Sequence, residues 1–197
     1  MRSVEEPLPL TFEVRPGRAV VVQGDPFPGA WIVRSGRLLM EAVDAEGRRL
    51  TIDLLGRGDL VGGPPGWMAE ATVRAWTESW LAAAPPAAIR DGLARRAQRT
   101  ASLALALAWD PVPQRVTDRL LDLADRFGRP VPDGGRCLRF PLTQEELAGL
   151  IGSNRETVNR ALAGLRRRGA VSGGGSDPFV IRPQPADPSS PPAAVHG

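Results

Sequence analysis

Short apolar stretches separated by glycines fill the first part of the chain, from Thr11 to about Ala83. The stretches lie at 19–22, 31–33, 38–40, 50–55, 71–73 and 80–81. Short strands at regular spacing, with turn residues between them, are typical of an all-β sandwich or barrel. Asp44-Ala45-Glu46-Gly47 has the composition of a hairpin connection. We therefore predict an antiparallel β-barrel or jelly roll over residues 1–84.

The pattern changes from strand to helix after Pro85-Pro86. Residues 87–109 contain no proline and one glycine, and are rich in alanine, leucine and arginine. We predict one helix over residues 85–110, of which residues 87–109 alone would span about 35 Å. Its apolar stripe has a spacing near seven residues, with Arg96 at one position, and consists of Ile89, Leu93, Thr100, Leu103 and Leu107. Such a narrow stripe favours pairing with a second copy of the chain, and packing against its own barrel is the alternative.

More helices are expected beyond Asp110-Pro111-Val112-Pro113, where the long helix ends or kinks. The apolar face of the next helix consists of Val116, Leu120, Leu121, Leu123, Ala124 and Phe127. Residues 129–141 are rich in proline and glycine and are predicted to be a loop. A short strand is predicted at 179–181. Residues 184–197, dominated by Pro, Ala and Ser, are predicted to be a disordered tail.

Two short helices joined by a tight turn are predicted between residues 142 and 167. Thr143 and Glu146 form a capping box, which starts the first helix. Gly152 ends it in a left-handed conformation, and Ser153 or Asn154 caps the second helix. The residues predicted to be buried are Leu147, Ala148 and Ile151 in the first helix and Val158, Leu162 and Leu165 in the second. This arrangement is a helix-turn-helix unit.

The polar side of the second helix, residues 154–167, carries candidate DNA contacts. Arginine pairs bidentately with guanine, and glutamate accepts from the amino group of cytosine. We predict that four side chains in the first two turns read bases in the major groove: Arg155, Glu156, Asn159 and Arg160. Contacts to the DNA backbone are predicted for Thr143, Ser153, Asn154 and Thr157. The alternative is a solvated face on which Glu156 and Arg160 form an ion pair.

The distribution of charge agrees with a polyanionic partner for the last third of the chain. The net charge is +3, and all 25 positive side chains are arginine. Residues 1–114 carry 13 arginines and 13 acids, whereas residues 115–182 carry 12 arginines and 8 acids, an excess of four. Positive charge is expected where a protein meets nucleic acid. The run Arg166-Arg167-Arg168 is either a solvated helix end or a backbone contact.

Composition argues against several kinds of chemistry. Lysine is absent, so Schiff-base and P-loop lysine chemistry are absent too. The one histidine, His196, adjoins the C-terminus. Its position argues against histidine catalysis, a histidine metal site and a haem sensor. The one cysteine, Cys137, is too few for an iron–sulfur cluster. No apolar run is long enough for a membrane helix. Asp53 and Asp59 could form a catalytic carboxylate pair, but no other residue pattern supports an active site. We therefore expect a protein without enzymatic activity, metal or cofactor, and we expect it to be cytoplasmic.

The predicted helix-turn-helix resembles that of the Crp/Fnr family of bacterial transcription regulators. The matching positions are Thr143, 146–148, 151–152, 155–158, Arg160, Leu162 and Leu165. In the barrel, residues 32–36 resemble the family's strand-and-glycine motif, and 58–62 resemble its Gly-Asp-x-x-Gly turn. The resemblance covers about residues 14–182 and implies an α+β chain. Its parts are a cyclic-nucleotide-binding-like β domain (1–84), a dimerisation helix (85–110) and a winged helix-turn-helix domain (111–183) with its wing at 171–181.

The resemblance also implies partners. A homodimer of this kind reads an inverted repeat on double-stranded DNA, is associated with the bacterial nucleoid and contacts RNA polymerase, and the segment 129–141 takes the position of the family's contacting loop. The alternative function is a ligand-sensing regulator whose C-terminal helices bind protein. Steeply salt-dependent, sequence-selective affinity for duplex DNA distinguishes the two.

The effector region departs from the family pattern. Members that bind cyclic nucleotides use a Gly-Glu-Leu element and then an arginine, which neutralises the cyclic phosphate. Here no glutamate follows Gly62, Ala69 replaces the arginine, and Glu70 would repel a phosphate. The candidate pocket consists of Gly62, Glu70, Arg74 and Thr100, with Arg74 as its remaining cation. We therefore predict that cyclic AMP is not bound. The tryptophans at 31, 67, 76 and 80 either line a pocket for another ligand or belong to the core.

Overall fold

The computed structural model describes residues 11–138, 140, 142–174 and 177–182. The predicted tail at 184–197 therefore lies outside the described residues. Contacts divide the chain into two compact units, one made of residues 1–111 with 148–154, the other of 112–147 with 155–197. The main division follows Pro111, where the sequence predicts the long helix to end.

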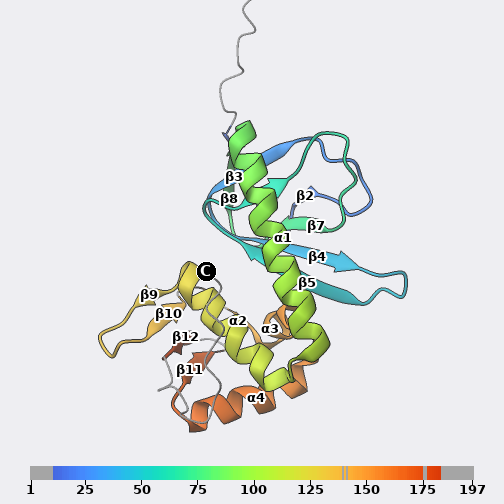
Figure 1. Ribbon diagram of the computed structural model, residues 1–197. Coiled ribbons are helices and arrows are strands. Elements are labelled where there is room, and N and C mark those ends of the chain that lie inside the picture. Colours follow the sequence, from blue (N-terminus) through green and yellow to red (C-terminus); the bar gives the residue numbers. More distant parts are fainter. Residues whose placement is uncertain (1–10, 139, 141, 175–176, 183–197) are drawn as a thin grey trace, which may run out of the picture. The chain divides into compact units, whose positions relative to one another are not determined.

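Eight strands of the first unit form two four-stranded antiparallel sheets (Figure 1). The strands are β1 (Thr11–Val14), β2 (Ala19–Val21), β3 (Ala30–Ser35), β4 (Leu38–Val43), β5 (Arg49–Leu55), β6 (Leu60–Gly62), β7 (Thr72–Ala75) and β8 (Ser79–Ala83). One sheet has the order β1-β8-β3-β6, and the other has the order β2-β7-β4-β5. Apart from the β4–β5 hairpin, successive strands thus change sheets in the manner of an eight-stranded jelly roll, as predicted.

The two sheets share one hydrophobic core. Val33 and Leu81 enter it from the first sheet, and Leu38 and Val73 enter it from the second. Buried and less buried side chains alternate along β7, so Arg74 lies on the face of this strand opposite to the buried Val73. The core therefore contains apolar side chains from the inner faces of the two sheets, whereas charged side chains such as that of Arg74 lie on the outer faces.

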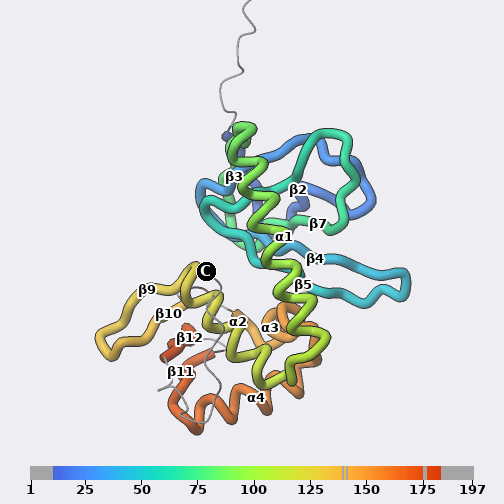
Figure 2. Tube along the Cα trace, in the orientation of Figure 1, coloured from blue at the N-terminus to red at the C-terminus, as the bar shows by residue number. Residues whose placement is uncertain are grey.

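The predicted hairpin at residues 44–47 joins β4 and β5, and this pair extends away from the rest of the sheet (Figure 2). Asp44 Oδ1 accepts hydrogen bonds from the backbone N–H groups of Glu46 at 3.1 Å and Arg48 at 2.9 Å. The pattern did not indicate β1 or β6. All three residues of β6 are buried, so this strand shows no alternation.

Helix α1 (Pro86–Trp109) contacts β5 and β6 within the first unit. Gly92 lies at a close approach of the helix to β6, because a Cβ atom there would be 2.5 Å from Cβ of Leu60. The predicted apolar stripe does not keep to one side. Leu103 is buried, whereas Thr100 is exposed and the three other stripe residues, Ile89, Leu93 and Leu107, are half-buried.

The second unit consists of helices around a small sheet. Its elements are α2 (Val112–Phe127), β9 (Arg129–Pro130), β10 (Arg136–Leu138), α3 (Gln144–Leu150, whose last three residues group with the first unit), α4 (Arg155–Arg167), β11 (Val171–Gly174) and β12 (Asp177–Ile181). The sheet order is β11-β12-β10-β9. Five apolar side chains of this unit are at most 1% exposed: Val116 and Leu120 of α2, Val158 and Leu162 of α4, and Phe179 of β12. These residues form the apolar interior of the unit.

Two predictions in this region are wrong. Residues 129–141 are not simply a loop, because β9 and β10 pair as a hairpin and β10 also pairs with β12. The strands are too short to show alternation, and Pro130 is tolerated because β9 is an edge strand. The sequence pattern places Leu121 on the apolar face of α2, but this residue is 39% exposed. Its neighbours Leu120 and Leu123 supply the buried face.

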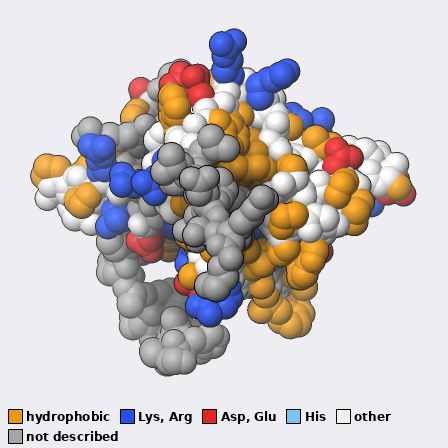
Figure 3. All heavy atoms as spheres, turned by 90° about the horizontal axis from the view of Figure 1, so that it is seen from above, with side chains coloured by type: hydrophobic (Ala, Val, Ile, Leu, Met, Phe, Trp, Pro, Cys, Tyr) orange, Lys and Arg blue, Asp and Glu red, His pale blue; other side chains and the backbone are white. Residues whose placement is uncertain are grey.

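Large apolar side chains also reach the surface, and hydrophobic atoms lie among the charged ones in Figure 3. The most exposed are Trp109, Trp67, Met68 and Leu105. No helix in the described part of the chain is long and apolar enough to cross a membrane.

Replacing Gly92 by alanine is expected to destabilise the first unit. The new Cβ atom would overlap Cβ of Leu60, so α1 would have to move away from β6. We expect the free energy of unfolding to fall by about 1–3 kcal/mol, as in other overpacked sites, although alanine is the better helix former. Urea denaturation measures the change.

Gly164→Ala in α4 is the matched control for this prediction. A Cβ atom at Gly164 would meet only arginine side-chain atoms, at 3.6 and 3.9 Å. We expect this variant to be more stable by about 0.5–1 kcal/mol. Equal effects of the two substitutions would contradict the close approach at Gly92.

Candidate functional site

The first helix of the helix-turn-helix begins with the predicted capping box. The backbone N–H and the hydroxyl of Thr143 donate to Glu146 Oε2 at 2.7 and 2.8 Å. In return, the backbone N–H of Glu146 donates to Thr143 Oγ1 at 3.1 Å. Both partners are thus fixed, and α3 begins where the sequence predicts.

The turn and the second helix also follow the prediction. Gly152 has a φ of 60°, and the N–H of Ser153 donates to the carbonyl of Ala148 at 3.0 Å. Helix α4 begins at Arg155, so Asn154 is at its N-cap position. The predicted buried residues of both helices, Leu147, Ala148, Ile151, Val158, Leu162 and Leu165, are each at most 2% exposed.

The predicted base-reading residues share the solvent side of α4. Arg155, Glu156, Asn159 and Arg160 are all exposed. Among the described residues, no ion pair joins Glu156 to Arg160, and the guanidinium of Arg160 instead donates to Thr157 Oγ1 at 3.3 Å. The alternative of a salt-bridged helix face therefore lacks its central ion pair. The charged side chains remain directed to solvent.

The residues predicted to contact phosphates lie at the first turns of α3 and α4. Asn154 and Thr143 are exposed, whereas Ser153 and Thr157 are half-buried. The hydroxyl of Thr143 already donates to Glu146. A phosphate would have to replace that bond, whereas the N-terminal ends of both helices present backbone N–H groups to anions.

Three polar residues connect the elements of the second unit, and the sequence pattern does not indicate the partners of any of them. Gln144 Nε2 donates to Asn159 Oδ1 at 3.2 Å and thereby links α3 to α4. Arg166 donates to the carbonyl of Gly173 at 2.7 Å and thereby links α4 to β11. Arg182 pairs with Asp133 at 2.6 Å. The three arginines at 166–168 therefore differ in role. Arg166 links two elements of the fold, whereas Arg167 and Arg168 are exposed.

In the first unit, Arg99 of α1 forms ion pairs with two aspartates. Its Nε lies 2.6 Å from Asp53 Oδ2, and its Nη2 lies 3.1 Å from Asp59 Oδ1. Both aspartates are buried, and they also accept hydrogen bonds at 2.9 Å from the N–H groups of Leu54 and Gly56, respectively. Buried charges require such pairing. The carboxylate pair noted in the sequence therefore anchors α1 to the jelly roll.

Arg96, one turn earlier, makes a second attachment. Its Nη2 donates to the carbonyls of Leu60 at 2.9 Å and Gly62 at 3.0 Å. Burial and the charge of Arg99 lower the pKa of Arg96, while Asp53, Glu70 and Asp59 act in the opposite direction. The guanidinium is directed at β6, which is why Arg96 does not belong to an outward-facing stripe.

The candidate effector loop, residues 63–71, connects β6 and β7. It is held by hydrogen bonds from Phe27 N to Trp67 O at 2.7 Å and from Ala69 N to Asp25 O at 2.9 Å. Gly62, at its start, has a φ of 80°, and a Cβ atom there would collide with the carbonyl of Gly29. Glu70 is the one charged residue of the loop and is exposed.

Comparison with known proteins relates both units to one family. Residues 114–184 match a Crp-like helix-turn-helix domain, and residues 11–96 match a cyclic nucleotide-binding domain. A CRP-like cAMP-activated global transcriptional regulator of Mycobacterium tuberculosis is 34% identical over 185 residues, covering 82% of each protein. The chain belongs to the Crp/Fnr family of transcription regulators.

Solved structures of Crp/Fnr regulators show the same fold. FixK2 from Bradyrhizobium japonicum has a TM-score of 0.77 at 19% identity, over 89% of this chain and 93% of that one. A CRP/FNR family regulator from Thermus thermophilus, TTHA1359, has a TM-score of 0.73 at 26% identity, over 88% and 94%.

The cyclic nucleotide that this fold implies does not fit the residues present in the loop 63–71. A cyclic phosphate needs a positive partner, and the charge of this loop is negative. Arg74 lies on the outer face of β7, and Thr100 is exposed on α1. Neither predicted pocket residue therefore supplies a cation to the loop. The guanidinium that does reach Gly62 is that of Arg96, and it already donates to the carbonyls of Leu60 and Gly62.

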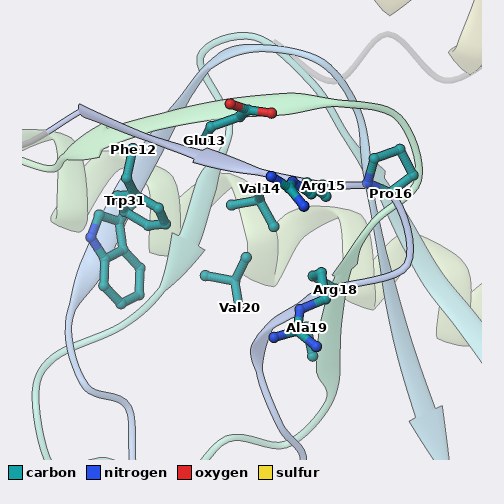
Figure 4. A pocket seen from close by; sticks show the side chains of 9 residues that line it. All are labelled: Phe12, Glu13, Val14, Arg15, Pro16, Arg18, Ala19, Val20 and Trp31. Atoms are coloured by element: carbon teal, nitrogen blue, oxygen red, sulfur yellow. The ribbon is translucent and has the colours of Figure 1, made fainter.

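A separate groove of about 750 Å³ lies beside β1 and β2 (Figure 4). Phe12 and Trp31 meet edge to face in it, with ring centroids 5.7 Å apart, and Val14 and Val20 face one another. Of the four tryptophans predicted either to line a pocket or to belong to the core, Trp31 lines this groove. Trp67 and Trp80 are 63% and 41% exposed, and Trp76 is half-buried.

Replacing Arg99 by methionine is expected to weaken the first unit strongly. The change leaves the buried carboxylates of Asp53 and Asp59 without their cation, which typically destabilises a protein by about 3–5 kcal/mol. Urea denaturation measures the loss. Adding Asp53→Asn and Asp59→Asn to the variant should restore part of it, because the uncompensated charges are then removed.

Arg95→Met is the control. Arg95 is exposed, and among the described residues its one hydrogen bond is to the carbonyl of Gly58, at 3.4 Å. We expect a change within about 0.5 kcal/mol, as for other surface positions. A similarly small loss for Arg99→Met would show that the ion pairs do not anchor the helix.

Proposed function

We propose that this Crp/Fnr regulator is a homodimer that reads an inverted-repeat site on double-stranded DNA and needs no cyclic AMP to do so. Helix 154–167 enters the major groove, where Arg155, Glu156, Asn159 and Arg160 contact bases. Thr143, Ser153, Asn154 and Thr157 contact the DNA backbone. Two such helices, related by a two-fold axis, reach half-sites about 34 Å apart.

The observation that carries this proposal is the exposed polar half of α4. Neither Arg155 nor Glu156 forms an ion pair within the part of the chain that the structure describes. A glutamate beside DNA phosphates weakens binding unless it accepts a hydrogen bond from a base. The presence of Glu156 between arginines therefore supports base reading over general attraction to the DNA backbone.

Helix α1 supports the proposed dimer. Its solvent side is lined by small and apolar residues, namely Ala94, Ala97, Ala101, Ala104, Leu105 and Ala108, all exposed. Small residues allow two helices to approach closely, and burial of such a stripe stabilises a helix pair. The half-buried Leu93 and Leu107 border the same side. We propose that α1 pairs with α1 of a second copy along this side.

Independence from cyclic AMP is supported by the ion pairs of Arg99 and by the loop 63–71. The M. tuberculosis relative is named for its activation by cAMP. In this chain the loop supplies Glu70 in place of a cation, and α1 is already attached to β5 and β6 through Arg96 and Arg99. We propose that these internal contacts make a bound nucleotide unnecessary.

The remaining parts of the proposal concern partners and chemistry. We propose that the protein acts at the nucleoid and contacts RNA polymerase through the hairpin of β9 and β10. We also propose that it has no metal, haem, iron–sulfur cluster or enzymatic activity. The described residues hold no group of three or more side chains suited to a metal. The aspartates at 53 and 59 have a structural partner in Arg99.

Selection of binding sequences from a random duplex pool, with and without cyclic AMP, tests the proposal. We expect a two-fold-symmetric site to be enriched equally in both conditions, with half-sites about one helical turn apart. Enrichment only with cyclic AMP would contradict the argument from the loop 63–71. Enrichment in neither condition would contradict constitutive DNA binding and favour the protein-binding alternative.

Ala101→Glu is expected to break the dimer. It places a charge in the middle of the alanine side of α1, where two like charges would meet across the two-fold axis. Sedimentation should show a monomer, and affinity for the selected site should fall. Ser102→Glu, at the adjacent exposed position about 100° around the helix, is the control and should leave the dimer intact. Dimerisation of both variants would place the interface elsewhere.

A further inference from the structure

The bond between Gln144 and Asn159 connects the two helices of the helix-turn-helix on their polar side. Gln144 is the first residue of α3, and Asn159 lies in the second turn of α4. Gln144 Nε2 donates to Asn159 Oδ1 at 3.2 Å, between residues far apart in sequence. The contact therefore depends on how the helices pack.

Other residues already stabilise this part of the fold. Thr143 and Glu146 cap α3, while Leu147 and Val158 are fully buried. Gln144 is half-buried, and Asn159 is exposed. A hydrogen bond between amides near the surface adds little to stability, because water satisfies the same groups after unfolding. Its effect is to orient the Asn159 side chain.

The direction of the bond determines which edge of the Asn159 amide is fixed. Its oxygen accepts from Gln144 and retains a second lone pair, and neither N–H group of its nitrogen has a partner among the residues that the structure describes. A carboxamide oriented in this way has a donor and an acceptor side by side. In the major groove, adenine presents the complementary pair, because N7 accepts and the N6 amino group donates.

We infer that Asn159 reads adenine and that Gln144 is the residue that positions it. The inference rests on the proposed function of α4. The Asn159 nitrogen donates to N7, and its oxygen accepts from N6 while still bonded to Gln144. Guanine presents two acceptors, so its O6 faces the amide oxygen unfavourably, and cytosine lacks the acceptor that the amide nitrogen requires. Fixing the amide before binding removes part of the cost of ordering it on DNA.

The test uses the full-length protein and the site selected from the random pool. Affinities are measured for this site and for duplexes in which each base pair of a half-site is replaced in turn. For the unmodified protein we expect one position at which adenine is favoured by about 5- to 100-fold. Asn159→Ala should abolish the preference at that position and leave the other positions unchanged.

Gln144→Ala and Gln144→Glu test the positioning role. Neither side chain can donate to the Asn159 oxygen, so the adenine preference should fall by roughly two- to tenfold at the same position. In Gln144→Glu the new side chain is nearly equal in size to glutamine. Its added charge weakens binding to all sequences, so the ratio of the affinities for adenine and for the other bases isolates the loss of positioning. Glu145→Ala, at the exposed neighbouring position of α3, is the control and should keep the ratio. Circular dichroism verifies that each variant is folded.

The outcomes separate this inference from the proposed function. A symmetric site at which no adenine position responds to Asn159→Ala would overturn the inference alone. A position that responds to Asn159→Ala but to neither Gln144 variant would overturn the positioning role. Failure to enrich any site would overturn the proposed function and, with it, the inference. Arg155→Ala, which should alter a different base pair, shows that the assay detects individual positions.

Discussion

The attachment of α1 to the jelly roll depends on the ion pairs that Arg99 makes with Asp53 and Asp59. Burial of two carboxylates is unfavourable unless a cation and additional hydrogen-bond donors face them, and here Arg99 and two backbone N–H groups supply these partners. The close approach at Gly92 and the bonds of Arg96 act along the same helix. These contacts determine which side of α1 remains exposed, and therefore which side is available to a second copy.

The same residue type has different roles in the two units. In the first, Arg96 and Arg99 are directed inward and bind carbonyl or carboxylate oxygens. In the second, Arg166 links α4 to the wing, whereas Arg155 and Arg160 remain on the exposed side of α4. A chain that uses arginine for every positive charge thus supplies both structural anchors and candidate DNA contacts. Burial, rather than residue type, distinguishes them.

The helix-turn-helix shows how a stable fold leaves a polar surface available. The capping box, the turn at Gly152 and the apolar faces of α3 and α4 satisfy the local requirements of both helices. The side chains on the opposite face of α4 are therefore not needed for folding. This separation leaves side chains such as those of Glu156 and Asn159 on the exposed face, where the proposed contacts to DNA bases would be made.

Most strands of the jelly roll, the long helix, the capping box and the exposed face of α4 can be predicted from the sequence, because each depends on local periodicity or on residues a few positions apart. The sequence did not reveal β6, the hairpin of β9 and β10, or the division of the apolar stripe on α1. The tertiary structure alone decided that Arg99 pairs with Asp53 and Asp59, and that Gln144 bonds to Asn159. Those partners are distant in sequence, and no periodic pattern records which charges or amides the folded chain brings together.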